Sequence, residues 1–224
     1  MTPEVIQYSR ILDAYQEFYL NFAVSVSEGN ETPVHILYYK LSNELNLDTN
    51  RYTNDDRNLD WHLWCSCAEI RGSVLGYSIK DMDGDGIPEL IILSEDYTVH
   101  AIYSLSGDVP ILIDAYWPRH SCVIGENGEL YTHSSSGAGD WYFSYCRVVD
   151  SSPDLQLIEQ FGIESFDPQT YNTIPSRCYR VHDGIKEIID YEEFETAFSE
   201  FPGFSTEITE KAGLCFIPFS VKAD

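Results

Sequence analysis

The sequence predicts an α+β fold, with an N-terminal helical hairpin packed on an antiparallel β-meander and a C-terminal hairpin and helix after it. Apolar residues near the N-terminus recur every three or four positions, and after Gly76 the period changes to two. Short turn-forming segments then separate the apolar runs. At 224 residues we expect one domain over 1–224, with a helical layer at 1–60, the meander at 76–150 and the remaining elements at 151–224.

The first expected element is a long amphipathic helix that begins near Thr2, which can cap it, with Pro3 in its first turn. The helix should end between residues 25 and 29. Thr32 and Pro33 repeat this opening for a second helix, antiparallel to the first. The core stripes of the two helices are Tyr8, Ile11, Leu12, Tyr15, Phe18, Tyr19 and Phe22, and then Val34, Leu37, Leu41 and Leu45.

Residues 48–60 are polar and rich in carboxylates, so we expect a solvated loop there. The pattern of residues 61–64 assigns neither helix nor strand. The expected strands of the meander are 77–80, 90–93, 98–105, 109–115, 121–124, 130–133 and 141–149. Tight joins, above all Asn127-Gly128, make them antiparallel, because parallel crossovers need a dozen residues or more.

The C-terminal part adds a strand at 155–161 and a hairpin of 178–181 with 185–189. Asp190 and Glu193 form a capping box for a helix over 191–201, and Pro202 and Gly203 stop it. A last strand is expected at 214–221.

The acidic run 81–89 gives the clearest indication of a specific chemistry. Asp81, Asp83 and Asp85 stand at alternate positions and can converge on one cation if the backbone turns sharply. Gly84 and Gly86 allow such a turn, because positive φ costs glycine little. Hard oxygen ligands in a flexible loop suit Ca²⁺ better than Mg²⁺, which demands tighter octahedral geometry.

The spacing matches the first half of an EF-hand loop, in which the backbone carbonyl of Ile87 would be a ligand. The second half departs from it, because Ile92 stands where a bidentate Glu belongs and Glu89 is the nearby late carboxylate. Pro88 and the apolar run after it predict a strand instead of a second helix. The predicted Ca²⁺ ligands are Asp81, Asp83, Asp85, Ile87 and Glu89; the alternative is an acidic turn that holds no metal.

The run resembles the calcium loops of FG-GAP and related repeats. More closely, residues 76–92 resemble a group of secreted or lipid-anchored proteins of unknown function from Gram-positive gut bacteria, whose shared phrase is roughly Gly-Tyr-x-x-x-Asp-x-Asp-Gly-Asp-Gly-x-x-Glu-Leu. Tyr103, Arg119 and residues 134–139 stand about where those proteins place them, so the likeness covers about 70–147. It implies the fold, the metal loop and an extracellular or cell-surface location, and it implies no activity.

The charge restricts the class of partner, since 13 basic and 37 acidic residues give a net charge of −24. Such a field repels phosphate backbones, so we expect no nucleic-acid partner. No apolar window is long enough for a transmembrane segment, and no signal peptide is visible at Met1. Because the resemblance implies export, we expect an extracellular or cell-surface location, with the cytoplasm as the alternative. The six cysteines leave disulfide bonding open.

Better-defined catalytic signatures are missing, so we expect a non-catalytic protein with an unknown protein or glycan partner, by default a monomer. Residues 134–139 should form an exposed polar turn, and His100, His120 and His133 should be surface residues or hydrogen-bonded core residues and not general bases. One alternative is a carbohydrate- or peptide-binding module that uses Trp61, Trp64, Trp117 and Trp141. Another is an acidic intracellular protein that neutralises a basic toxin or enzyme.

Overall fold

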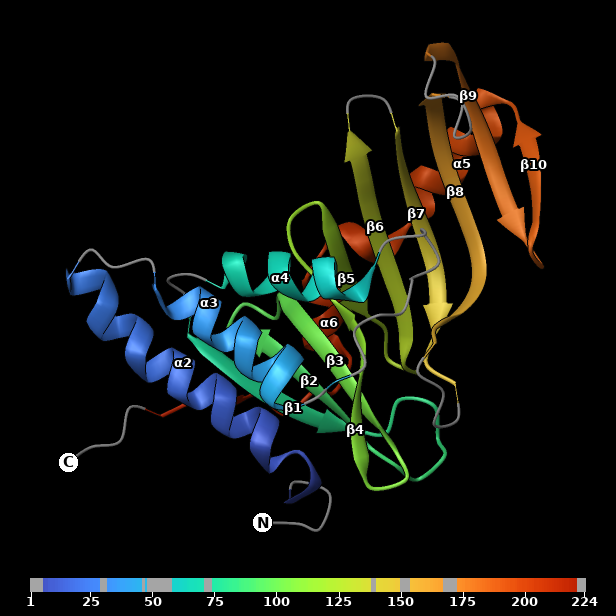
Figure 1. The fold of residues 1–224 in the computed structure, drawn as a ribbon. Coiled ribbons are helices and arrows are strands. Elements are labelled where there is room, and N and C mark those ends of the chain that lie inside the picture. The colour runs from blue at the N-terminus through green and yellow to red at the C-terminus, as the bar shows by residue number, and fades with distance from the viewer. Residues whose placement is uncertain are drawn as a thin grey trace.

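The computed structural model describes residues 6–28, 32–45, 47, 58–70, 74–137, 140–149, 154–166 and 173–220. It confirms the α+β class: helices come first, antiparallel strands follow, and a helix packs near the C-terminus (Figure 1). The helices are α2 (Ser9–Glu28), α3 (Thr32–Tyr39) with a π-helical continuation η1 (Lys40–Glu44), α4 (Leu59–Glu69), α5 (Tyr191–Glu200), the 3₁₀ turn η2 (Pro202–Phe204) and α6 (Glu207–Lys211). The expected helix start at Thr2 and Pro3 lies outside the described residues.

The strands form two antiparallel sheets. The first has the order β11-β1-β2-β3-β4, from β1 (Leu75–Lys80), β2 (Glu89–Ser94), β3 (Val99–Ser106), β4 (Val109–Ala115) and β11 (Ile217–Pro218). The second has the order β10-β9-β8-β7-β6-β5, from β5 (His120–Ile124), β6 (Glu129–Gly137), β7 (Asp140–Arg147), β8 (Gln156–Phe166), β9 (Thr173–His182) and β10 (Ile185–Ile189).

The meander divides between β4 and β5. There Trp117 and His120 pair across a tight turn, and Pro118 has no backbone N–H with which to continue a ladder. The chain therefore leaves the first sheet at Ala115 and starts the second at His120. Alternation of apolar and polar residues does not mark this division.

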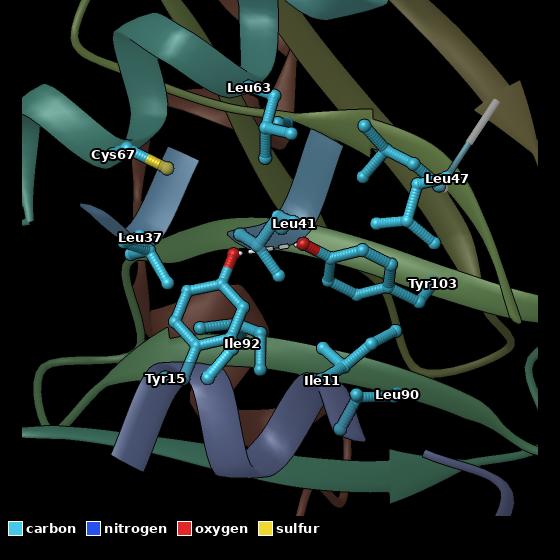
Figure 2. Packing of buried hydrophobic residues seen from close by; sticks show 14 of the residues in the cluster. Ile11, Tyr15, Leu37, Leu41, Leu47, Leu63, Cys67, Leu90, Ile92 and Tyr103 are labelled. Carbon is cyan, nitrogen blue, oxygen red and sulfur yellow. Dashed lines mark hydrogen bonds between the residues drawn. The ribbon is translucent and has the colours of Figure 1, made fainter. Parts of the chain in front are cut away.

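The N-terminal helices cover one face of the first sheet, as expected (Figure 1). Their apolar stripes meet Leu90, Ile92 and Tyr103 on the sheet, and the hydroxyl oxygens of Tyr15 and Tyr103 lie 3.0 Å apart inside this core (Figure 2). Each hydroxyl thus satisfies the other, which removes the cost of burying an unpaired polar group.

Strand β2 is buried along its whole length because it lies between two cores. Successive side chains of a strand point to opposite faces. Leu90 and Ile92 enter the core beneath the helices, whereas Ile91 and Leu93 enter a second core with residues of β5, β6 and β7. The first sheet is therefore sandwiched between the helices and the start of the second sheet.

Helix α5 covers part of the second sheet, where Phe194 and Phe201 pack on Phe143. Its predicted capping box is confirmed in one direction, because the Asp190 side chain accepts a hydrogen bond of 2.8 Å from the Glu193 backbone N–H. The last strand predicted at 214–221 is shorter than expected: β11 spans Ile217–Pro218 and pairs with β1.

Helix α4 covers residues 61–64, to which the sequence assigned no element. Asn58 caps it by accepting a hydrogen bond of 2.7 Å from the Asp60 N–H. Its buried residues include His62 and Ser66 beside Leu59 and Leu63. Polar residues on the buried face break the apolar period, and this is why the helix is hard to find in the sequence.

Candidate metal centre

The acidic run 81–88 connects β1 to β2, so it leads from one strand into the next as the sequence predicted. Gly84 and Gly86 adopt φ values of 82° and 87°, in the left-handed region that other residues avoid. A Cβ at either position would meet nothing within 4 Å. The backbone conformation, and not a lack of space, therefore requires glycine at these two positions.

The aspartates of the loop accept hydrogen bonds from its own backbone. The two carboxylate oxygens of Asp81 accept from the N–H groups of Gly84 at 2.7 Å and Gly86 at 3.0 Å. Asp83 accepts from the N–H of Asp85 at 3.1 Å, and Asp85 accepts from the N–H of Ile87 at 2.6 Å. These bonds hold the loop in a curl with its carboxylates near one another.

Glu89 closes the loop from the first position of β2 and is buried, with 1% of its surface exposed. One carboxylate oxygen accepts from the Met82 N–H and the other from the Ser104 hydroxyl, each at 2.9 Å. Burial raises the pKa of Glu89 to about 7, and nearby Asp83 adds to the rise, whereas the two hydrogen bonds oppose it. A cation beside Glu89 would favour its charged form.

The structure brings together three of the four predicted carboxylate ligands. One carboxylate oxygen from each of Asp81, Asp83 and Glu89 lies within 4.8 Å of the others. This group leaves out Asp85, whose carboxylate accepts from Ile87. Three acidic oxygens suit a hard divalent cation, and Ca²⁺ would need further oxygens to reach six or more ligands.

The loop also contacts the second sheet. Met82 inserts into the second core and is 5% exposed. The β5–β6 turn packs against the backbone of Met82, since a Cβ added to Gly128 in this turn would stand 2.0 Å from the Met82 carbonyl oxygen. Lys80 donates hydrogen bonds to the carbonyls of Glu126 at 3.0 Å and Ala212 at 2.6 Å. The position of the carboxylates is thus coupled to the packing of one sheet on the other.

The expectation of an exposed turn at 134–139 was wrong for its first part. Strand β6 continues through Gly137, and Ser134 is completely buried between His120 on β5 and Tyr142 on β7. Residues 138 and 139 lie outside the described residues. Residues 134–137 are small and do not alternate between apolar and polar types, so no local pattern indicates a strand there. Only the pairing with neighbouring strands reveals this part of β6.

The tryptophans lie in different environments. Trp61 is 56% exposed on α4, and Trp64 on the same helix is partly buried. Trp117 packs against two histidine rings, and Trp141 packs among the aromatic residues of α5. The four indoles therefore do not form one surface.

A second group of metal-ligating side chains was not expected from the sequence. His62, Asp114 and His120 lie together and all three are buried. His62 and Asp114 are 52 residues apart, so no local spacing indicates the group.

His100 gives a pH dependence that can be tested. It is 7% exposed, and its Nε2 lies 2.6 Å from the Ser94 hydroxyl. Burial lowers the pKa of His100 to about 4, although nearby Asp96 opposes the shift. As the pH falls, the His100 ring binds a proton in the unfolded chain before it does so in the folded one. The free energy of unfolding should therefore fall by about 3 kcal/mol between about pH 6.5 and about pH 4. The His100→Gln variant should lose less stability over this pH range than the original protein does. Urea unfolding at several pH values measures the difference.

Exposed His182 supplies the control for this measurement. His182→Gln should keep the acid slope of the original protein. Equal slopes for all three proteins would show that the His100 ring protonates without opening the fold.

No helix within the described residues is long and apolar enough to cross a membrane. No family model matches the chain, and no curated protein matches it. Among solved structures, one described as a Xanthomonas type IV secretion system related protein aligns with 17% identity and a TM-score of 0.30. The alignment covers 50% of this chain, and this chain spans 56% of that one. This likeness is too weak to carry a conclusion about fold or function.

Proposed function

We propose that the β1–β2 loop binds one Ca²⁺ through Asp81, Asp83 and Glu89, with Asp85 and the Ile87 carbonyl as further oxygen ligands. The convergence of three carboxylates beside the buried Met82 supports this proposal most directly. The ion would stabilise the junction between the two sheets. The protein would then be a non-catalytic interaction domain of the extracellular or cell-surface kind that the loop sequence resembles.

Electrostatics favours a cation at this place. Three carboxylates within 4.8 Å repel one another, and the buried one is costly to ionise. A divalent ion offsets both costs, and the net charge of −24 attracts cations to the surface. Extracellular calcium modules bind with dissociation constants of about 10⁻⁴ to 10⁻³ M, so the site would fill outside the cell.

Calcium should raise the stability of the protein. With Ca²⁺ at ten to a hundred times its dissociation constant, mass action adds about 1–3 kcal/mol to the free energy of unfolding. For a chain of this size the melting temperature should rise by about 3–10 °C, and a chelator should reverse the rise. Differential scanning calorimetry with and without Ca²⁺ measures both effects.

Two variants make this test specific. Asp81→Ala should abolish the calcium-dependent rise, whereas Asp13→Ala should keep it, since Asp13 is exposed on α2 and its loss changes the net charge equally. If the melting temperature of the original protein does not change when Ca²⁺ is added, the proposal is overturned. An Asp81→Ala variant that responds to Ca²⁺ as the original protein does would overturn it as well.

A second candidate function is recognition of a glycan or peptide by an aromatic face on α3 and α4. Tyr39 and Trp61 are each 56% exposed, and Ile36 is 42% exposed. Trp64 lines both of the depressions on this face, and its ring centroid lies 4.8 Å from that of His35. Two shallow depressions adjoin here, lined by His35, Ile36, Tyr38, Tyr39, Lys40, Asn58, Asp60, Trp61 and Trp64. Exposed aromatic rings beside polar groups suit sugar rings and extended peptides.

Tryptophan fluorescence tests this face with a panel of soluble oligosaccharides and peptides. Trp61→Ala should weaken any binding by about tenfold or more. Tyr191→Ala should leave it unchanged, because Tyr191 is 59% exposed on the distant α5. If no member of the panel changes the fluorescence, this candidate function fails.

A further inference from the structure

Three buried side chains from three different elements meet where α4 and the two sheets come together. His62 comes from α4, Asp114 from the end of β4 and His120 from the start of β5. The Nδ1 atom of His62 lies 2.6 Å from one carboxylate oxygen of Asp114, and the Nε2 atom of His120 lies 2.9 Å from the other. Each residue is at most 4% exposed.

Further contacts fix the orientation of these groups. The Nδ1 atom of His120 shares a hydrogen bond with the hydroxyl of buried Ser134. The backbone N–H of Ala115 donates to Asp114 at 2.8 Å. Metal-bound histidines commonly hydrogen-bond through their second ring nitrogen, as the Nδ1 atom of His120 does here. The Nε2 atom of His120, which now contacts Asp114, would then face the ion.

A buried hydroxyl beside histidine and aspartate also resembles a hydrolytic triad. Ser134, His120 and Asp114 are connected in that order by hydrogen bonds. However, the Ser134 side chain is completely buried, so no substrate can reach its oxygen. Nucleophilic catalysis is therefore not what this arrangement supports.

We propose that His62, Asp114 and His120 bind a transition-metal ion, with Zn²⁺ as the preferred ion. Two imidazole nitrogens and one carboxylate form a ligand set that suits Zn²⁺ and leaves a fourth position open. Ca²⁺ prefers oxygen ligands alone, so this centre is chemically distinct from the acidic loop.

The separations are close to those that zinc requires. Two ligand atoms about 2.1 Å from a tetrahedral ion lie roughly 3.4 Å apart. The N–O distances of 2.6 and 2.9 Å run to the two different oxygens of Asp114, and one ligand atom from each of the three residues lies within 4.8 Å of the others. Binding of an ion would therefore require the two imidazole rings to reorient around the carboxylate.

A cavity lies beside the proposed site. It has a volume of about 370 Å³, and Tyr116 and Trp117 contribute to its lining together with Glu69 and Asp96. The rings of Tyr116 and Trp117 each pack on His120 with centroids 5.1 Å apart. Both residues thus line the cavity and contact a proposed ligand, so we expect an ion to enter from this side.

The test is to remove metal from the full-length chain with a strong chelator, add Zn²⁺ or Co²⁺, and desalt the protein in excess Ca²⁺. Plasma mass spectrometry should find about one retained Zn²⁺ per chain, and Co²⁺ should give the visible absorption bands of a low-coordinate site. His120→Gln should abolish retention, and His182→Gln should not, because His182 is exposed on β9.

Ser134→Ala distinguishes metal binding from a purely structural network. The variant keeps all three ligands, and loss of the bond to His120 should lower zinc affinity by about ten- to a hundredfold. A folded His120→Gln variant that retains Zn²⁺ as the original protein does would overturn the proposal. If His120→Gln fails to fold, the Co²⁺ spectrum of the original protein tests the proposal instead. A spectrum without the bands of a low-coordinate site would overturn it.

Discussion

Gly128→Ala is expected to lower the free energy of unfolding by about 3–5 kcal/mol, the combined cost of backbone strain and overpacking. Gly128 has a φ of 79°, and its Cβ would stand 2.0 Å from the Met82 carbonyl oxygen. Backbone lies on both sides of this contact, so no flexible side chain can move away. The acidic loop and the β5–β6 turn would have to separate, which would also weaken the calcium site. Urea unfolding measures the loss.

Gly107 in the β3–β4 turn provides a matched control. Its φ of 64° is equally unfavourable for alanine, but a Cβ there would meet nothing within 4 Å. Gly107→Ala should therefore cost about 1 kcal/mol. Equal costs for the two variants would contradict a close contact between the loop and the turn.

Asp114→Ala is expected to cost about 3–5 kcal/mol in the presence of chelator. The carboxylate faces two buried imidazoles, and its removal leaves both without the partner they now contact. Burial opposes ionisation of Asp114, but the two histidines outweigh it and lower its pKa. Because chelator removes any bound metal, the measured loss belongs to the protein network alone. Chemical denaturation at neutral pH is the suitable measurement.

Asp108→Ala at the opposite end of the β3–β4 hairpin is the control. Asp108 is exposed and accepts one hydrogen bond, from Gln7. Its replacement should cost less than about 1 kcal/mol. A cost this small at Asp114 as well would mean that the buried network contributes little to the fold.

Local patterns in the sequence were sufficient for most elements. The stripe from Tyr8 to Phe22 predicted α2, and alternation predicted the limits of β4 and β10 without change. The glycines of the acidic loop predicted its left-handed turns, because positive φ is a property of single residues. Likewise, Asp81 and Asp83 lie close together because the chain between them is short.

The tertiary structure decided what depends on contacts between distant residues. The break after Ala115 produced two sheets, and pairing with β5 and β7 made Ser134 a buried strand residue. Packing of α4 then placed His62 beside Asp114, although neither residue has a local pattern that indicates a site. The sequence by itself determined most of the strands, the glycine turns and the acidic loop, because short-range sterics and periodicity govern them. The division into two sheets and the buried His-Asp-His cluster were decided by long-range packing, which no local spacing records.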